Sequence, residues 1–280
     1  MIWAAESFIG AVDCNEEYTF SELLIMAEIH CSATPSVHFA IDTALYDLQA
    51  QRNNVSLSKL CNKSSQSCVQ LSQALINREK AINNDIIKFK IGVNHVTDDI
   101  NFLNQISQQH PLLKIRLDAN QHFSVQEFES LYNNISHLKI DFFEEPIKNP
   151  NIKKIEYIKN KYPGLRYALD ESLYQKTDYK DWIKKGLIDT VVIRPSILGG
   201  FNRFFKIIKL HREKVQFLIS SSLENSVGNM AIIHLASTLE TKDKHGINIY
   251  DFFNEFIKSP IYKNNHIELQ DLKGLGFYND

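Results

Sequence analysis

Five charged residues recur along this chain at nearly constant intervals and could together perform acid–base chemistry on a small molecule. They are Lys90, Asp118, Glu144, Asp170 and Arg194, and they stand 28, 26, 26 and 24 residues apart. A strand followed by a helix and its loops takes about 30 residues of a β/α barrel. Because the carboxyl ends of parallel strands converge on one mouth of such a barrel, we expect these side chains to face a common point.

Strand alternation supports this expectation, because residues two apart point to the same side of a strand. Lys88 shares a face with Lys90, and Arg116 shares one with Asp118. Taken singly, each feature has an ordinary explanation: a lysine pair on a strand is usually a solvated edge, and an acid at a strand end is usually a helix cap. The joint pattern at one interval favours a site.

Three carboxylates gathered at one mouth would repel one another, and a divalent cation removes that conflict. A site built from oxygen atoms suits Mg²⁺, with Mn²⁺ as a second possibility. No histidine or cysteine accompanies the three acids, which disfavours zinc. The sequence therefore predicts a magnesium site formed by Asp118, Glu144 and Asp170.

Short apolar runs that alternate with helical stretches set the fold class. The predicted strands are 68–71, 86–91, 112–118, 140–145, 166–170, 189–194, 215–221 and 247–251. Strands that alternate with helices indicate a parallel sheet, and eight of them favour a closed (β/α)8-type barrel. An open doubly wound sheet is the alternative, although no GxGxxG motif or P-loop supports its nucleotide-binding forms.

The residues before the barrel have a different character. Segments 21–29 and 34–51 have apolar residues at helical spacing, with Thr34 and Pro35 suited to a helix start, whereas 52–66 is polar and predicts a linker. We expect a smaller α+β domain over residues 1–63, to which 256–280 return, and a catalytic barrel over 64–255.

Composition limits the kinds of partner. The 280 residues are 44% hydrophobic and 23% charged, with a formal net charge of −2, which argues against nucleic acid or an anionic membrane as the main partner. Cys14, Cys31, Cys61 and Cys68 form no CxxC pair, so we expect reduced thiols in a cytoplasmic protein. No apolar run is long enough to span a bilayer and the start lacks the features of a signal peptide. The sequence carries no signal for an oligomeric state.

Six segments at the predicted strand ends resemble the enolase superfamily, and within it the o-succinylbenzoate synthases. The segments are KFKIG (88–92), RLDAN (116–120), FFEEP (142–146), ALDES (168–172), VVIRP (191–195) and ISSSLENSVGN (219–229). The similarity extends from about Pro35 to GLGF (274–277). It implies a (β/α)7β barrel together with a capping domain.

The resemblance also implies roles for individual residues. Asp118, Glu144 and Asp170 would bind Mg²⁺, with Glu145 and Glu171 as second choices. Lys90 would be the general base, with Lys88 beside it. The residues that would position the metal shell and the substrate are Asn120, Arg116, Ser220, Ser221 and Ser222.

The implied reaction is the Mg²⁺-dependent syn-dehydration of a cyclohexadiene carboxylate to o-succinylbenzoate in menaquinone biosynthesis, a carbon–oxygen lyase reaction through an ene-diolate. A positive neighbour and a divalent cation would favour the neutral, basic form of Lys90. Two alternatives stay open: an N-acyl amino acid racemase or dipeptide epimerase, and a catalytically impaired remnant that only binds carboxylates.

Two features depart from the superfamily pattern. Arg194 stands where related sixth strands offer a lysine, and arginine can lie over a substrate ring as a cation–π partner but cannot serve as a base. Only 34 residues precede Pro35, so we expect a capping domain without its first strands, in which 4–12 form the end of the cap sheet. Such a protein should have an open mouth, poorly anchored residues 1–34 and exposed apolar surface on the 34–51 helix.

Overall fold

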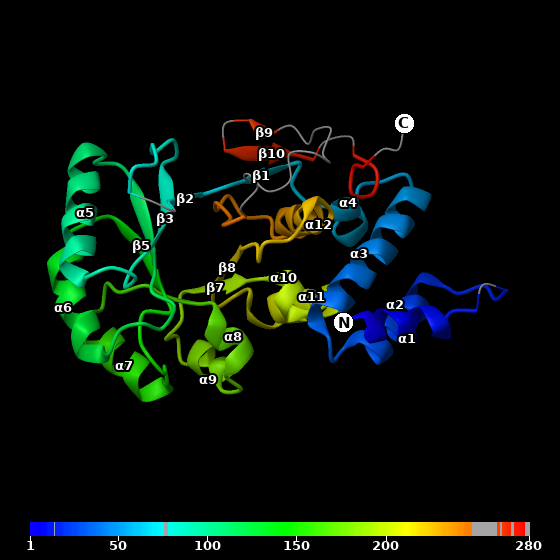
Figure 1. Ribbon diagram of the computed structural model, residues 1–280, viewed down its shortest axis with the longest axis horizontal. Coiled ribbons are helices and arrows are strands. Elements are labelled where there is room, and N and C mark those ends of the chain that lie inside the picture. The colour runs from blue at the N-terminus through cyan, green and yellow to red at the C-terminus, as the bar shows by residue number, and fades with distance from the viewer. Residues whose placement is uncertain (14, 76–77, 248–261, 264, 270–271, 278–280) are drawn as a thin grey trace. The chain divides into compact units, whose positions relative to one another are not determined.

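The computed structural model describes every residue except 14, 76–77, 248–261, 264, 270–271 and 278–280 (Figure 1). Its helices are α1 (Ile2–Ala11), α2 (Phe20–Cys31), α3 (Pro35–Arg52), α4 (Leu57–Cys61), α5 (Val96–Gln109), α6 (Val125–Ile135), α7 (Ile152–Lys161), α8 (Glu171–Gln175), α9 (Tyr179–Lys184), α10 (Pro195–Leu198), α11 (Phe201–His211) and α12 (Ser226–Ser237). Its strands are β1 (Cys68–Gln70), β2 (Gln73–Leu75), β3 (Ile86–Lys90), β4 (Lys114–Asp118), β5 (Ile140–Glu144), β6 (Tyr167–Leu169), β7 (Thr190–Ile193), β8 (Gln216–Ile219), β9 (Tyr262–Lys263) and β10 (His266–Glu268).

Two sheets form within these described residues. One has seven strands in the order β2-β3-β4-β5-β6-β7-β8, which is also their order in the sequence. The pairs from β2 to β7 are parallel, as the alternation of strands and helices predicts. The other sheet is antiparallel, in the order β1-β10-β9.

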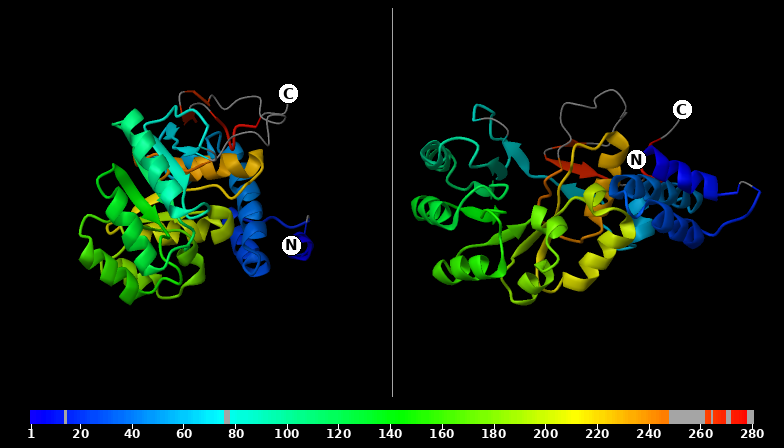
Figure 2. Two further views of the ribbon diagram at one scale, coloured as in Figure 1. Left: turned by 60° about the vertical axis from the view of Figure 1, so that its left-hand side comes forward. Right: turned by 60° about the horizontal axis from the view of Figure 1, so that its bottom comes forward.

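The chain divides into two compact units. Unit 1 comprises 1–71, 193–210 and 219–280, and unit 2 comprises 72–192 and 211–218. In unit 2, α5, α6 and α7 lie along one face of strands β3 to β5 (Figures 1 and 2).

Helix α6 shows why such a segment forms a helix on this face. Phe128, Leu131 and Ile135 recur at three- and four-residue steps and are fully buried. Ser124 accepts a hydrogen bond from the Glu127 backbone, and the Glu127 side chain accepts one from the Ser124 backbone, so the first turn is capped in both directions.

The predicted strand at 68–71 does not belong to the large sheet. Its residues Cys68–Gln70 form β1, which pairs antiparallel with β10, and the large sheet instead begins at β2. The prediction was wrong because a short apolar run does not reveal which strand it will pair with. The predicted strand at 247–251 lies almost wholly outside the described residues.

The N-terminal segment also differs from expectation. Residues 4–12, predicted as the end of a cap sheet, lie mostly within helix α1, which spans Ile2–Ala11. Ala4 and Phe8, one helical turn apart, are buried against Ala27 and Cys31 of α2. Residues 2–11 are therefore anchored. The predicted linker at 52–66 likewise contains helix α4, whose start is capped by Ser56.

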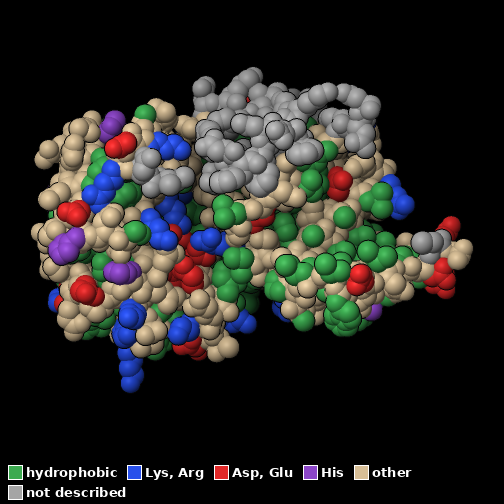
Figure 3. Space-filling model, in the orientation of Figure 1, with side chains coloured by type: hydrophobic (Ala, Val, Ile, Leu, Met, Phe, Trp, Pro, Cys, Tyr) green, Lys and Arg blue, Asp and Glu red, His purple; other side chains and the backbone are tan. Residues whose placement is uncertain are grey.

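Much apolar surface remains exposed on the two N-terminal helices. The exposed side chains are Met1, Ile2, Trp3, Ile9, Ile25 and Ile29, and Figure 3 shows hydrophobic side chains gathered over this part of the molecule. On the 34–51 helix, Leu48 is 46% exposed. The predicted exposure on this helix is therefore limited to one side chain among the large hydrophobics, and the exposed apolar surface lies instead on α1 and α2.

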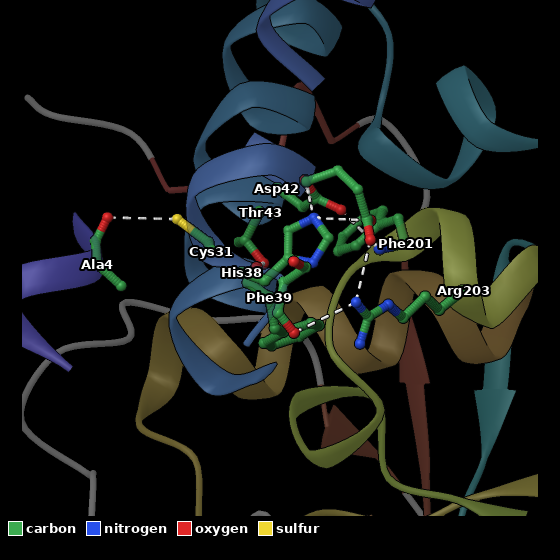
Figure 4. Close-up of polar contacts among 10 residues, drawn as sticks. Ala4, Cys31, His38, Phe39, Asp42, Thr43, Phe201 and Arg203 are labelled. Atoms are coloured by element: carbon green, nitrogen blue, oxygen red, sulfur yellow. Dashed lines mark hydrogen bonds and ion pairs between the residues drawn. The ribbon is translucent and has the colours of Figure 1, made fainter. Parts of the chain in front are cut away.

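A buried polar cluster joins α3 to the start of α11 within unit 1 (Figure 4). The Oδ2 atom of Asp42 accepts a hydrogen bond of 2.7 Å from the backbone nitrogen of Phe201. His38 Nε2 lies 3.5 Å from Asp42 Oδ1 and 3.6 Å from a Glu28 carboxylate oxygen, and Arg203 pairs with Glu28 at 3.0 Å. Burial raises the pKa of Asp42 to about 6.

His234 on α12 should make the protein sensitive to acid. It is fully buried, accepts a hydrogen bond at Nδ1 from the Ser58 backbone, and has its pKa lowered to about 4 by burial, against an ordinary value of 6.5. The pKa of His234 is lower in the folded state than in the unfolded state. Its contribution to the free energy of unfolding is therefore fully present above pH 6.5 and falls by about 3 kcal/mol as the pH is lowered to 4.

Denaturant unfolding at a series of pH values measures this effect. The free-energy difference between the wild type and His234→Gln should shrink by about 3 kcal/mol from pH 7 to pH 4. The opposite contribution of Asp42 is common to both proteins and cancels in the difference. His137→Gln, a change at an exposed histidine, is the matched control and should show no such trend. A difference that stays constant with pH would contradict the prediction.

Candidate active site

The carboxyl ends of β3, β4 and β5 bring predicted site residues to one level of the sheet. In the parallel register Lys90 pairs with Asp118, and Asp118 pairs with Glu144. Adjacent strands in a parallel sheet lie about 4.8 Å apart, so side chains on the same face at one level come close together. The expectation that these strand ends align is confirmed.

The ammonium group of Lys88 lies between two of the predicted metal ligands. Its Nζ atom is 2.8 Å from Asp118 Oδ2 and 2.8 Å from Glu144 Oε1. Burial by itself lowers the pKa of Lys88, but the two carboxylates outweigh it and raise the pKa above its ordinary value. Lys88 is therefore a fixed positive charge here.

Glu144 is a deeply buried acid whose pKa reflects both its burial and its charged neighbours. It is 1% exposed, and this burial raises its pKa well above the ordinary value. Lys88 opposes the rise, while the charges of Asp118 and Asp170 add to it. Because both acids act on the same carboxyl group, all three predicted ligands belong to one electrostatic neighbourhood.

Among the described residues, the carboxylates of Asp118 and Glu144 form ion pairs with Lys88 and none with Lys90. Lys90 is exposed and lines a cavity of about 930 Å³, a size suited to a small organic ligand. The other residues that line this cavity are Ala74, Leu75, Arg78, Glu79, Lys88, Phe89, Val93, Asn94 and Asp98. The two lysines of the KFK segment therefore have different surroundings, although they share a strand face.

Asp170 follows β6 and is the N-cap residue of α8. Its backbone nitrogen donates a hydrogen bond of 3.0 Å to the side chain of Glu145, a residue with a left-handed backbone, φ 42°. For a residue other than glycine such a conformation costs about 1–3 kcal/mol. Burial raises the pKa of Glu145 to about 7, against the hydrogen bonds that lower it. From the sequence, Glu145 is predicted only as a second-choice ligand.

Asn120 and Arg116 occupy different surroundings. Asn120 donates a hydrogen bond of 2.6 Å to Glu171, so it links the turn after β4 to the start of α8. Arg116 is 2% exposed, pairs with Asp141 at 2.8 Å, and its guanidinium carbon lies 5.1 Å from the centre of the Phe142 ring. Their predicted contacts with a substrate stay predictions.

The remaining predicted residues belong to unit 1. Arg194 directly follows β7 and is the N-cap of α10, and Ser220 directly follows β8 and donates a hydrogen bond to the Gly246 carbonyl. Glu224 connects the loops that follow these two strands. It accepts hydrogen bonds from the Ser222 backbone at 2.6 Å and from the Ser196 hydroxyl at 2.5 Å. Ser221, which lies between Ser220 and Ser222 in the chain, donates a backbone hydrogen bond to the Gly246 carbonyl.

The three acids fit magnesium in the chemistry of their donors. Asp118, Glu144 and Asp170 are buried carboxylates, the charges of Asp118 and Asp170 both act on Glu144, and hard oxygen ligands of this kind are those that Mg²⁺ prefers. In the described part of the chain, no three histidine, cysteine, aspartate or glutamate side chains converge into a ready-made cage. Lys88 instead supplies the positive charge between two of the acids.

The sheet order, the level strand ends and the buried acids beside lysines are those of a β/α-barrel protein with charged groups gathered at the carboxyl ends of its strands. A family model described as "Enolase C-terminal domain-like" matches residues 72–280. The chain belongs to this family of the enolase superfamily, which confirms the predicted barrel class.

Curated relatives of this chain carry more than one activity. An o-succinylbenzoate synthase of Proteus mirabilis is 27% identical over 259 residues, which are 90% of this chain and 73% of that protein. An L-Ala-D/L-Glu epimerase of Clostridium acetobutylicum is 26% identical over 274 residues, or 92% of this chain and 76% of that protein. Identity alone does not separate the two reactions.

Solved structures support the fold. A dipeptide epimerase from Enterococcus faecalis has a TM-score of 0.81 at 20% identity, over 98% of this chain and 84% of that one. A muconate lactonizing enzyme from Pseudomonas putida has a TM-score of 0.79 at 18% identity, over 92% of this chain and 76% of that one. Among the described residues, no helix combines the length and the apolar character needed to cross a membrane.

Proposed function

We propose that this protein is a Mg²⁺-dependent carbon–oxygen lyase that dehydrates a cyclohexadiene carboxylate to o-succinylbenzoate in menaquinone biosynthesis, in the cytoplasm. The observation that carries the proposal is the pairing of Lys88 with buried Asp118 and Glu144, next to a second lysine, Lys90, that lines a cavity. The similarity to the o-succinylbenzoate synthase of Proteus mirabilis supports this choice of reaction.

The proposed site divides binding from proton transfer. Mg²⁺ held by Asp118, Glu144 and Asp170 would stabilise the negative charge that develops on the substrate carboxylate. Lys88, held by two carboxylates, keeps its charge and adds a fixed cation to the same region. Lys90, which lines the cavity, is the group available to move a proton.

The reaction balances with one proton-transfer group. Lys90 takes the proton from the carbon next to the carboxylate, and the electron pair forms a carbon–carbon double bond as the β-hydroxyl leaves. Lys90 returns the proton to that hydroxyl, which departs as water. Because proton and hydroxyl leave from the same side of the ring, a single lysine serves as base and then as acid.

Epimerisation is the second candidate, because relatives with epimerase names match this chain at similar identity. A two-base epimerase removes a proton from one face of a carbon and delivers a proton to the other. In this chain the residue after β7 is Arg194, and a guanidinium remains protonated at any pH at which proteins are folded. Arg194 can attract a flat anion but cannot accept its proton, which favours elimination.

Parallel assays in deuterated buffer test the choice. We expect the cyclohexadiene carboxylate to dehydrate, with loss of activity in EDTA and recovery with Mg²⁺. N-succinyl amino acids of either hand should keep their configuration. Arg194→Lys should retain much of the dehydration, because a cation remains in place.

Two results would contradict the proposal. Inversion at a rate similar to dehydration would favour the epimerase and would require a second base. Binding of carboxylates without turnover of any substrate, at all Mg²⁺ concentrations, would favour a non-catalytic remnant.

A further inference from the structure

Glu145, the second acid of the EEP segment, is fully buried and takes no part in the proposed reaction. Its exposed fraction is 0%, and its backbone has a left-handed φ of 42°. A buried carboxylate is costly unless hydrogen bonds satisfy it, and a left-handed glutamate adds conformational cost. Both features indicate that surrounding groups hold this side chain in place.

The Glu145 carboxylate accepts hydrogen bonds from the loop that carries Asp170. Its Oε1 atom accepts from the Asp170 backbone nitrogen at 3.0 Å and from the Ser172 backbone nitrogen at 2.8 Å. Its Oε2 atom accepts from the Ser172 hydroxyl at 2.9 Å and more distantly from Gln121 Nε2 at 3.4 Å. All four partners can donate, which matches a group that only accepts.

These contacts join three strand ends through one residue. The Glu145 carbonyl oxygen accepts a hydrogen bond of 2.7 Å from the Gln121 backbone after β4, and its backbone nitrogen donates to the Ala168 carbonyl in β6. Glu145 itself directly follows Glu144 at the end of β5. The turn between β6 and α8 therefore cannot move without breaking bonds to the end of β5.

Two of the bonds bracket Asp170 along the chain, at its own nitrogen and at the nitrogen two residues later. Fixing both points sets the backbone of Asp170, and the backbone sets the direction in which its carboxylate leaves the chain. A glutamine at position 145 has the same shape, but its amide group replaces one acceptor oxygen with a donor. In one orientation that donor would oppose the two backbone nitrogens, and in the other it would oppose Gln121 Nε2 and force the Ser172 hydroxyl to turn and accept.

We propose that Glu145 is a positioning residue that holds the loop after β6 so that Asp170 can bind Mg²⁺ together with Asp118 and Glu144. The inference rests on the proposed magnesium site, and it assigns Glu145 to the support of a ligand and not to metal contact. Groups of this kind commonly change metal affinity by about 10- to 100-fold when they are altered.

Calorimetric titration of MgCl₂ into the metal-free full chain tests the role. Glu145→Gln should raise the dissociation constant by about 10- to 100-fold, and Ser172→Ala, which removes one donor and keeps the backbone bonds, by less than about tenfold. Asp170→Asn is the reference variant: it shows how much Mg²⁺ affinity is lost when a proposed ligand itself is changed. Glu129→Gln is the matched control, because Glu129 pairs with Lys161 away from this loop, and it should bind as the wild type does.

A double variant separates positioning from a general structural effect. If Glu145 acts through Asp170, adding Glu145→Gln to Asp170→Asn should weaken Mg²⁺ binding no further, whereas independent effects would multiply. Hydrogen exchange in EDTA gives a readout without metal: the amide protons of Asp170 and Ser172 should exchange faster in Glu145→Gln and unchanged in Glu129→Gln.

The outcomes distinguish this inference from the proposed function. Wild-type affinity in Glu145→Gln, with a clear loss in Asp170→Asn, overturns the positioning role and leaves the magnesium site standing. Unchanged exchange at Asp170 and Ser172 overturns it whatever the metal does. A wild type that binds no Mg²⁺, or an Asp170→Asn variant that binds normally, overturns the magnesium site and the positioning role together.

Discussion

Replacing Lys90 with arginine should lower the turnover number for dehydration by about 10³-fold or more, because a guanidinium stays protonated and cannot take the proton. Arginine has a similar length, so the side chain should still fill the same space. Stopped-time assays of product formation at saturating substrate measure the loss. Mg²⁺ affinity and thermal stability should remain near the wild-type values, since Lys90 does not contact the buried carboxylates.

Lys114→Arg is the matched control for this change. Lys114 is an exposed lysine at the start of β4, at the other end of the strand from Asp118, and its replacement should leave the rate unchanged within about twofold. If Lys90→Arg retained more than a tenth of the wild-type rate, the assignment of Lys90 as the proton-transfer group would be wrong. The Mg²⁺ dependence could still hold in that case.

The sequence predicted the strands that carry the candidate site better than the elements around them. The runs that became β3, β4 and β5 are short, contain the β-branched and aromatic residues typical of strands, and end in charged residues, so the sequence indicated both the strands and their carboxyl ends. Strand β2 has only three residues and carries no such signal. Helix α1 was mistaken for a strand, although the four-residue step between Ala4 and Phe8 is helical.

Within the site, spacing predicted which strand ends align but not which groups would touch. The shared face of Lys88 and Lys90 follows from alternation along β3, yet their different surroundings depend on neighbouring strands. Both lysines line the cavity, and Lys88 also reaches the carboxylates of β4 and β5. The hydrogen bonds of Glu145 could not be predicted from the sequence either, because its partners, Asp170 and Ser172, are more than twenty residues away along the chain. Such contacts are set by tertiary packing.

Removing the ammonium of Lys88 should strongly destabilise the metal-free protein. In Lys88→Met the side chain keeps a similar length but leaves Asp118 and Glu144, which are 6% and 1% exposed, as buried acids without their shared cation. Breaking a buried ion pair by removing one partner typically costs about 3–5 kcal/mol, since the remaining charge is neither hydrated nor paired. Urea unfolding in EDTA should show a loss of free energy of unfolding in this range.

Lys161→Met provides the control, because Lys161 also pairs with a glutamate, Glu129 at 2.7 Å, but is 44% exposed. An exposed pair contributes only about 0–1 kcal/mol, so this variant should unfold within about 1 kcal/mol of the wild type. Saturating Mg²⁺ should recover part of the stability of Lys88→Met, since a divalent cation neutralises the same acids. Equal, small losses in both variants would show that Lys88 is not the charge that holds Asp118 and Glu144 together.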